Sequence, residues 1–361
     1  MDIAVIGGGH GCYAAAAQLS ENGHRVRLWR RDGDALAPVR EHGIHVRDYR
    51  GARNVAIAVV TDDLATAMRG AALIVAPLPA TTHEALAPLM APCFEDDQVV
   101  FLPPGTFGSV LFARAIRAAG NPARVCFGET GTLPYLTRKH GPREIVISGY
   151  GKRLPTGIWP SARSEFALAV IREAYPAIEP IEDALSGALM NAGPIIHPPL
   201  ILMNAGPLQH FPHWDIHNEG TQPAIRAVTD ALDAERMAIR EAFGYRAPHF
   251  PLAHHYAKEG EEWMYGRGAH DRLTDSGDWR EHIDLYTHRY MLEDTRLGLS
   301  LLVSAGRYNG TPTPVASGLL AIASAAVGRD LYSEGRTFES LGLNALSREA
   351  LSDLLARGYA A

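Results

Sequence analysis

Short apolar runs alternate with helix-like segments along the first half of the chain. Helical patterns such as 12–23 and 109–120 separate several of these runs. Strands that alternate with helices of this length predict βαβ units and a parallel, doubly wound sheet of Rossmann type. The runs that read as buried strands are DIAVIG (2–7), HRVRLW (24–29), NVAIAVV (54–60), ALIVAPLP (72–79), QVVFLPPG (98–105) and RVCFGET (124–130).

The pattern changes near residue 180. The segment 143–159 still reads as a hairpin that could extend the sheet, but strand-like runs then largely vanish. Residues 223–243 carry apolar positions at helical spacing, with Pro223 at the start and Gly244 just beyond the end, which predicts a long amphipathic helix. Further helical patterns follow, and 258–281 reads as a loop. We therefore predict a nucleotide-binding domain over 1–183 and an all-helical domain over 184–361.

Size and composition agree with a globular protein of two domains. The chain has 361 residues, of which 47% are hydrophobic and 20% charged, as in ordinary globular proteins. Its net charge of −6 gives no basic footprint, so nucleic acid is not an expected partner. The N-terminus opens directly into a strand, and no segment reads convincingly as a membrane span. These features predict a cytoplasmic protein with no membrane contact. The three cysteines, Cys12, Cys93 and Cys126, suggest no disulfide framework.

A glycine-rich turn lies between the first strand and the first helix. Gly7, Gly9 and Gly11 occupy this turn, with His10 between them, in IAVIGGGHGCY. Glycines at such a turn let the backbone approach a pyrophosphate, which then lies at the positive end of the helix. The strict GxGxxG fingerprint needs glycine where this chain has Cys12, a side chain small enough to be tolerated. The turn predicts binding of a nicotinamide dinucleotide through these four residues.

The end of the second strand bears on the choice between NADPH and NADH. An NAD enzyme usually has an acid here to hold the ribose 2′-hydroxyl. This chain has Arg30 and Arg31, and guanidinium groups pair with a 2′-phosphate. NADP is therefore the favoured cofactor. In the alternative, these arginines form a solvated turn, Asp32 or Asp34 takes the role of the acid, and NAD is the cofactor.

The apolar stretch 187–206 contains one titratable side chain, His197. A histidine in such surroundings is more often a core residue than a catalyst. However, Pro194, Pro198 and Pro199 should interrupt a helix around it and expose the ring at the end of an element. The start of the second domain is also a natural wall for a substrate cleft.

Several segments resemble the opine dehydrogenases, also called the octopine/nopaline dehydrogenase family. The most specific are MNAGPIIHPPLILMNAG (190–206), around His197, and HRYMLEDTRLGL (288–299), and the similarity runs over nearly the whole chain. The resemblance implies a Rossmann domain followed by a helical substrate domain. It also implies an NAD(P)H-dependent enzyme that condenses a 2-oxo acid such as pyruvate with the amino group of an amino acid and reduces the resulting imine.

The resemblance further implies that His197 and Asp294 form a catalytic pair. Imine reduction and its reverse need a group that moves a proton near neutral pH, and imidazole does so. A carboxylate bonded to the other ring nitrogen would fix the tautomer and stabilise the imidazolium. Glu293 is the alternative partner, since neighbours on an α-helix point about 100° apart and only one can face the cleft.

Four residues are candidates for substrate binding. Arg289 could bind a substrate carboxylate through two hydrogen bonds, although a structural salt bridge is equally consistent with the sequence. Asn204 would share a helical face with His197 if the helix resumes after the prolines. Glu129 and Thr130 follow the last strand of the Rossmann domain, at the sheet edge where ligands bind.

Other features leave alternatives open. His210, His213 and His217 are spaced like helical zinc ligands, but Pro212 and the polar context favour a loop, so no metal site is predicted. A related single-substrate reductase of ketopantoate or glycerol-phosphate type would rely on a lysine from the helical domain, where only Lys258 occurs. A non-catalytic NADPH sensor is a third reading. Helical domains of this kind often pair, which makes a homodimer an open expectation.

Overall fold

The computed structural model describes residues 1–359 and divides them into two compact units. Unit 1 comprises 1–78, 82–188 and the segment from Ser352 onward; unit 2 comprises Pro79–Thr81 and 189–351. The chain changes unit after residue 188, five residues beyond the predicted boundary, because helix α7 (Ala184–Ala188) packs on strands of unit 1. Pro79–Thr81 and the segment from Ser352 onward each belong to a unit formed mainly by residues far away in sequence, so a linear pattern does not reveal them.

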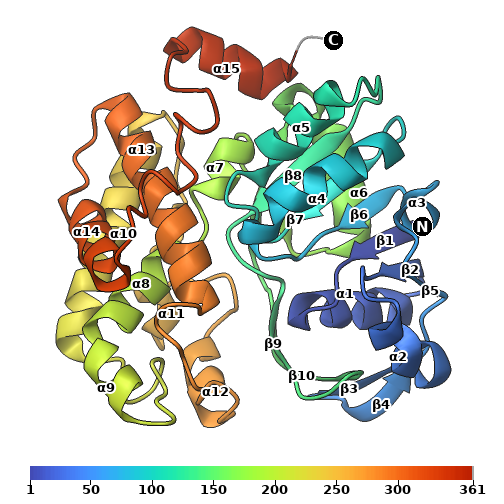
Figure 1. Cartoon of the computed structure of the whole chain (residues 1–361), viewed down its shortest axis with the longest axis horizontal. Helices are drawn as coiled ribbons and strands as arrows, with labels where there is room; N and C mark the ends of the chain where they lie inside the picture. Colours follow the sequence, from blue (N-terminus) through green and yellow to red (C-terminus); the bar gives the residue numbers. More distant parts are fainter. Residues whose placement is uncertain (360–361) are drawn as a thin grey trace. The chain divides into compact units, whose positions relative to one another are not determined.

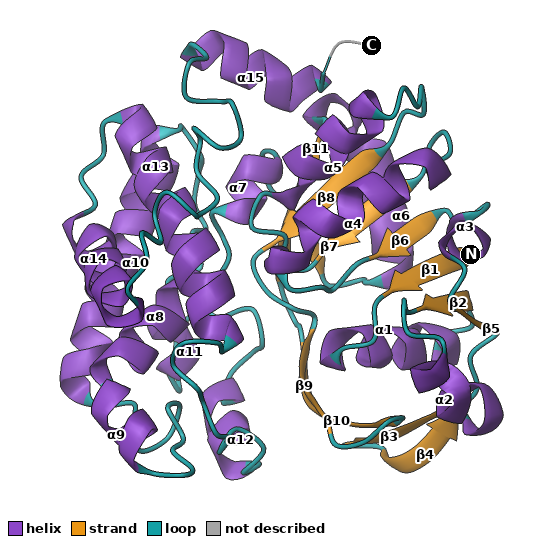
Figure 2. Ribbon diagram, viewed as in Figure 1, coloured by secondary structure: helices purple, strands orange, loops and turns teal. Residues whose placement is uncertain are grey.

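Unit 1 contains an eight-stranded sheet in the order β12-β11-β8-β7-β6-β1-β2-β5 (Figures 1 and 2). Its strands pair in parallel except that β11 runs antiparallel to β8. The predicted parallel sheet is thus confirmed. The strands are β1 (Asp2–Ile6), β2 (Arg25–Trp29), β5 (Val59–Thr61), β6 (Leu73–Val75), β7 (Val99–Leu102), β8 (Cys126–Thr130), β11 (Leu154–Trp159) and β12 (Ile178–Pro180).

A second sheet, in the order β4-β3-β10-β9, was not predicted. It consists of β3 (Ile44–Asp48), β4 (Gly51–Val55), β9 (Tyr135–Lys139) and β10 (Glu144–Tyr150). The hairpin predicted over 143–159 is wrong, because β10 pairs with β3 and β9 while β11 joins the main sheet. The run 54–60 is likewise split between β4 and β5, which belong to different sheets. Local alternation identifies a strand but not its partner.

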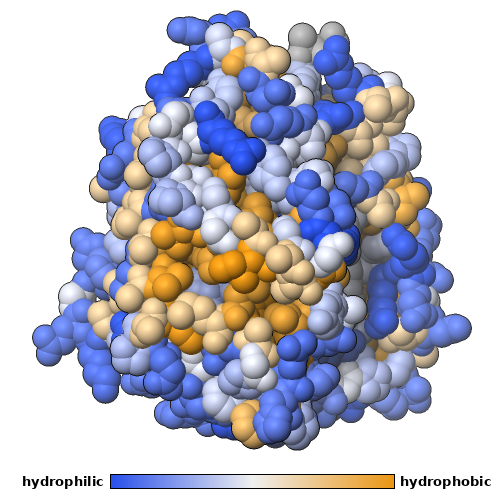
Figure 3. Space-filling model, turned by 60° about the vertical axis from the view of Figure 1, so that its left-hand side comes forward, coloured by the Kyte–Doolittle hydropathy of each residue, from blue (hydrophilic) through white to orange (hydrophobic). Residues whose placement is uncertain are grey.

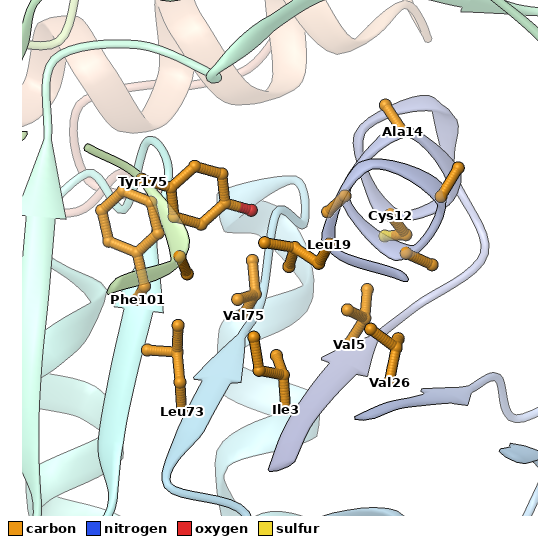
Figure 4. Packing of buried hydrophobic residues seen from close by; sticks show 14 of the residues in the cluster. Ile3, Val5, Cys12, Ala14, Leu19, Val26, Leu73, Val75, Phe101 and Tyr175 are labelled. Carbon is orange, nitrogen blue, oxygen red and sulfur yellow. The ribbon is translucent and has the colours of Figure 1, made fainter. Parts of the chain in front are cut away.

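Helix α1 (His10–Glu21) packs against both sheets of unit 1. It contacts β1 and β2 of the main sheet and also β3, β9 and β10 of the second sheet. Its alanines 14–17 are all fully buried, as in a helix that is apolar all round. Figure 4 shows α1 beside the side chains of Ile3, Val5 and Val26, which belong to the same buried cluster. The start of α1 is therefore held rigidly, which is what a ligand site at its N-terminus requires.

The remaining helices of unit 1 flank the main sheet (Figure 2). They are α2 (Ala37–His42), α3 (Leu64–Met68), α4 (His83–Met90), α5 (Gly108–Ala118), α6 (Ser164–Ala174) and α7. Helix α15 (Arg348–Arg357) begins in unit 2 and continues into the C-terminal segment of unit 1.

Unit 2 is built of helices, as predicted. The long helix expected over 223–243 is α10 (Pro223–Ala242), and the helical patterns after it include α14 (Pro314–Val327). The segment 258–281, predicted as a loop, contains the short helix α12 (Ala269–Asp275). The others are α8 (Gly193–Met203), α9 (Ala205–His210), α11 (Ala253–Tyr256), the π-helix η5 (Tyr290–Leu299) and α13 (Ser300–Asn309). No helix within residues 1–359 is both long enough and apolar enough to cross a bilayer.

Candidate active site

The glycine turn connects β1 to α1. Gly7 has a φ of +118°, and a Cβ there would lie 2.4 Å from Leu78 and 2.7 Å from the Cys12 sulfur. Only glycine fits this position. Cys12 is fully buried beneath the turn, so its small side chain fills the space where the fingerprint has glycine. The first N–H groups of the twelve-residue helix α1 point out of this turn, as binding of a pyrophosphate requires.

Arg30 follows β2 and lies across the glycine turn. A Cβ on Gly8 would be 2.5 Å from the Arg30 Cδ, so the arginine stem covers that glycine. The guanidinium is 3.6 Å from the carboxylate of Asp32, and this carboxylate also accepts the N–H of Ala35 at 3.2 Å. Arg31 is exposed. The side chain of Arg30, rather than that of Asp32 or Asp34, therefore lies against the glycine turn.

Lys139, at the end of β9, was missed by the sequence reasoning. Its backbone N–H donates to Nδ1 of His10 at 2.8 Å, and its ammonium donates to the carbonyl of Gly8 at 3.3 Å. The bond to Nδ1 leaves Nε2 of His10 as the protonated nitrogen when the ring is neutral. Lys139 is one of three lysines in the chain, but its place at the turn depends on the second sheet, which the pattern did not predict.

Glu129 and Thr130 end β8 and are both fully buried. The carboxylate of Glu129 accepts the backbone N–H groups of Phe107 and Ser109, each at 2.8 Å, at the start of α5. The hydroxyl of Thr130 donates to the carbonyl of Pro155 at 2.8 Å. Both side chains hold the backbone of unit 1, so their role in substrate binding stays a prediction without a contact that supports it.

Unit 2 brings His197 and Asp294 together. Nδ1 of His197, on α8, is 2.8 Å from Oδ2 of Asp294, on η5. A carboxylate accepts only, so Nδ1 carries the proton and exchange with a substrate falls to Nε2. Burial raises the pKa of Asp294 to about 7. This is the contact that the family resemblance implied.

Two glycines allow α8 and η5 to approach closely. A Cβ on Gly193 would lie 2.2 Å from Oδ1 of Asp294, and a Cβ on Gly298 would lie 2.2 Å from Cγ of Pro194. Neither distance is compatible with a larger residue in this arrangement. The contact between the histidine and the carboxylate thus depends on small residues at both ends of the crossing.

The expectation that prolines interrupt the helix around His197 is wrong. Helix α8 is continuous from Gly193 to Met203 and includes Pro198 and Pro199, while Pro194 lies in its first turn. A proline in the first turn loses no helical hydrogen bond, and the two inner prolines leave only the carbonyls of Pro194 and Ile195 without helical donors. The rest of the helix bonds normally, so His197 is presented from a helical face.

Aromatic side chains pack on the imidazole of His197. The ring of Tyr290 stacks on it at 3.9 Å between centroids, with an interplanar angle of 16°. His217 meets it edge-on at 5.7 Å. The histidine is therefore fixed by a carboxylate and by rings from two other segments of unit 2, as a proton-transfer group requires.

Glu293 is directed elsewhere. One carboxylate oxygen accepts the N–H of Ala80 at 2.8 Å, and Arg336 donates to the carbonyl of the same residue at 2.9 Å. Burial raises the pKa of Glu293 to about 7. Glu293 and Arg336 thus hold both polar groups of one residue of the Pro79–Thr81 segment, and Asp294 is the acid that contacts His197.

Arg289 lies immediately before η5 and is exposed. Its guanidinium carbon is 5.5 Å from the centroid of Tyr290, the ring that stacks on His197. Arg289 lies five residues before Asp294, a spacing that would place the two side chains on different faces of an α-helix. In a π-helix the turn is wider, so Arg289 and Asp294 lie nearer to one face.

Asn204 ends α8 and is buried. Its amide donates to the carbonyls of Leu200 and Gly220 and accepts the indole N–H of Trp214, all within 3.0 Å. These bonds anchor the loop that carries His217 against His197. A direct role of Asn204 in substrate binding stays a prediction.

The three histidines with the spacing of zinc ligands do not share one environment. His210 and His213 are exposed, whereas His217 is buried beside His197. Within residues 1–359, no group of three histidine, cysteine or acidic side chains is arranged to hold a metal ion.

Both parts of the chain are similar to known proteins. Residues 180–327 match the alpha-helical domain of the NAD/NADP octopine/nopaline dehydrogenases, and residues 2–104 match the N-terminus of NAD-dependent glycerol-3-phosphate dehydrogenase. An opine dehydrogenase from Arthrobacter sp. (strain 1C) is 29% identical over 352 residues, which cover 95% of this chain and 96% of the relative.

Two solved structures share the fold. An octopine dehydrogenase in complex with NADH and agmatine has a TM-score of 0.73 at 18% identity and covers 99% of this chain and 98% of its own. A yersinopine dehydrogenase with NADP+ bound has a TM-score of 0.64 at 15% identity, over 98% and 97% of the two chains. The predicted fold class and the predicted family resemblance are confirmed.

Proposed function

We propose that the chain is a member of the opine (octopine/nopaline) dehydrogenase family and that it catalyses NAD(P)H-dependent reductive condensation of a 2-oxo acid with the amino group of an amino acid. The substrate class is that of its relatives, with a pyruvate-like acid as the oxo partner. The observation that carries the proposal is the 2.8 Å contact between His197 and Asp294 in the helical domain.

The site residues suit the proton transfers of this reaction. Condensation releases water, and reduction of the protonated imine yields a secondary amine. Nε2 of His197 donates a proton to the reacting substrate and accepts one from it. Asp294 keeps Nδ1 protonated and stabilises the imidazolium. A bound reduced nicotinamide supplies the hydride. The proposal therefore requires that the cofactor held at the glycine turn reach His197 during turnover.

Arg289 is the proposed anchor for a substrate carboxylate. Its guanidinium lies over the ring that stacks against the imidazole and interacts electrostatically with Asp294, so a carboxylate bound to it would be near His197. Both substrates of the proposed reaction carry a carboxylate, and a bidentate bond would orient whichever one binds there.

NADPH is the proposed cofactor, with NADH as the alternative. The residues at the turn fit a dinucleotide because a positive φ and a missing Cβ at Gly7 open the backbone. Gly9, His10 and Gly11 would hold the pyrophosphate at the start of α1. Arg30 and Arg31 would pair with the 2′-phosphate, which the acid of an NAD enzyme would repel.

A single-substrate reductase is the competing function. The match to glycerol-3-phosphate dehydrogenase covers only residues 2–104, which is the cofactor part. A lysine mechanism in the helical half would depend on Lys258, which is the one lysine of residues 184–361 and is exposed.

A substrate screen with a matched variant tests the proposal. We expect NADPH oxidation only when an oxo acid (pyruvate or glyoxylate) and an amino acid are both present. Replacing His197 with asparagine should lower kcat/KM by about 100-fold or more, because general acid–base catalysis is lost, while NADPH binding is retained. Oxidation with the oxo acid alone would favour the single-substrate reductase. Tight NADPH binding without turnover would favour the sensor.

Pairing with a second copy and a cytoplasmic location stay predictions. Figure 3 shows an apolar patch on the surface that it presents. In unit 2, the outer face of α14 exposes small and apolar residues, including Ala321, Ile322 and Ala325, and Ile322 is 59% exposed. A face of this composition supports pairing in solution.

A further inference from the structure

Lys139 is a half-buried cation beside the glycine turn. Its ammonium donates to the carbonyl of Gly8 and lies 3.9 Å from the centroid of the Tyr13 ring. Within residues 1–359, no carboxylate forms an ion pair with it. Burial lowers the pKa of this ammonium, and the charge of Arg30 lowers it further. Lys139 thus shares its surroundings with a second cation and has no anion of the protein to balance it.

Arg30 reaches the same point from a different element. Its stem covers Gly8, whose carbonyl accepts the bond from Lys139. Among the described residues, Arg30 forms an ion pair with Asp32 alone, and this pair is long at 3.6 Å. Burial raises the pKa of Tyr13, and nearby Arg30 opposes that rise. Arg30 and Lys139 therefore flank Gly8 and Tyr13, one from the end of β2 and the other from the end of β9.

Two neighbouring cations with little acid between them repel each other, and partial burial adds a desolvation cost. Clusters of two partly buried cations are typical of anion-binding sites. The end of β2 is where the adenosine ribose lies in the dinucleotide fold, so the expected anion is a phosphate on that ribose.

We infer that Lys139 is a specificity-determining residue of the cofactor site, which together with Arg30 binds the 2′-phosphate of NADPH. This inference rests on the proposed function for the cofactor alone and is independent of the choice of substrates. It assigns part of the preference for NADPH to the second sheet, through β9, in addition to the residues after β2.

Ligand binding by the whole chain, without substrates, tests this role. The dissociation constants of NADPH, NADH, adenosine 2′,5′-bisphosphate and AMP would be measured by calorimetry for the wild type and for Lys139→Gln. We expect the substitution to weaken NADPH and the bisphosphate by about tenfold or more, because one charge-assisted hydrogen bond is lost. NADH and AMP should change by less than about twofold.

Two further variants act as controls. Lys152→Gln removes the same charge from an exposed position of unit 1 and should leave all four constants unchanged. Lys139→Arg keeps the charge and should retain most of the preference for the 2′-phosphate. An equal loss for NADPH and NADH would assign Lys139 to the pyrophosphate or to the fold and overturn the inference, as would no loss at all. A wild type that binds NADH more tightly than NADPH would instead contradict the proposed cofactor preference.

Discussion

Two adjacent acids of η5 perform different tasks at the scale of single residues. Asp294 contacts His197, whereas Glu293 holds the Pro79–Thr81 segment together with Arg336. Both carboxyls are buried, and burial raises the pKa of each to about 7. The second oxygen of Glu293 is buried without a hydrogen-bond partner, which adds to the cost of its ionisation.

This burial predicts a dependence of stability on pH. In the unfolded chain Glu293 titrates near 4.5, so the folded protein binds more protons than the unfolded chain between about pH 4.5 and 7. The free energy of unfolding should therefore fall as pH rises through this range. Glu293 alone should contribute up to about 3 kcal/mol, since each unit of pKa is worth about 1.4 kcal/mol.

Glu293→Gln isolates this contribution. Glutamine can still accept the N–H of Ala80 but does not ionise, so the variant should lose less stability than the wild type between pH 5 and pH 8. Denaturant unfolding at the two pH values measures the difference. Equal pH dependence in the two proteins would show that the carboxyl of Glu293 does not change its ionisation on folding. Asp294 titrates in both proteins, so the difference reports the ionisation of Glu293 together with its effect on Asp294.

At the scale of elements, the site depends on a close crossing of α8 and η5. Glycines at both ends of the crossing admit Pro194 and Asp294 at distances that a Cβ would forbid. The π-helical form of η5 also changes which residues share a face, and π-helical turns are frequent at functional sites. Periodicity alone did not distinguish this segment from the α-helix that continues it as α13.

Gly298→Ala should disturb this crossing. Its new Cβ would lie 2.2 Å from Pro194, so the helices must separate. We expect a loss of stability of about 1–3 kcal/mol, as for overpacked cores, together with a lower kcat because the contact between His197 and Asp294 widens. Thermal unfolding and steady-state kinetics measure both effects.

The matched control is Gly318→Ala on α14, where no heavy atom lies within 4 Å of the new Cβ. That change should stabilise the helix by up to about 1 kcal/mol and leave kcat unaltered. Equal behaviour of the two variants would mean that the crossing tolerates a methyl group and that the site does not depend on Gly298.

At the scale of the whole molecule, the chain passes between its units more often than two consecutive domains would require. The segment from Ser352 onward returns to unit 1, where the carbonyl of Leu354 accepts the indole N–H of Trp159 at 3.0 Å. The ring of Tyr359 meets Trp159 edge-on at 5.5 Å. The nucleotide-binding unit is therefore completed by residues that are far away in sequence.

Truncation after Leu351 should therefore weaken unit 1. Trp159, which is 4% exposed in the full chain, would lose its hydrogen-bond acceptor and its cover. We expect a loss of about 1–3 kcal/mol and a red shift of tryptophan emission, with faster amide exchange in β11. A truncated chain with unchanged unfolding and unchanged exchange in β11 would mean that the segment adds no stability.

The sequence by itself determined the alternation of strands and helices in the first half, the helical second half and the glycine turn, and its resemblance to the opine dehydrogenases indicated His197 paired with an acid at 293 or 294. Helical and strand periodicity, and motifs with fixed chemistry, are local properties of a chain. Only the tertiary structure decided that Asp294 and not Glu293 contacts His197, that β10 joins a second sheet, and that Lys139 lies at the turn beside Arg30. These outcomes depend on the pairing of distant strands, on the wider turn of a π-helix and on glycines that lack a Cβ. The local pattern of hydrophobic and polar residues does not encode any of the three.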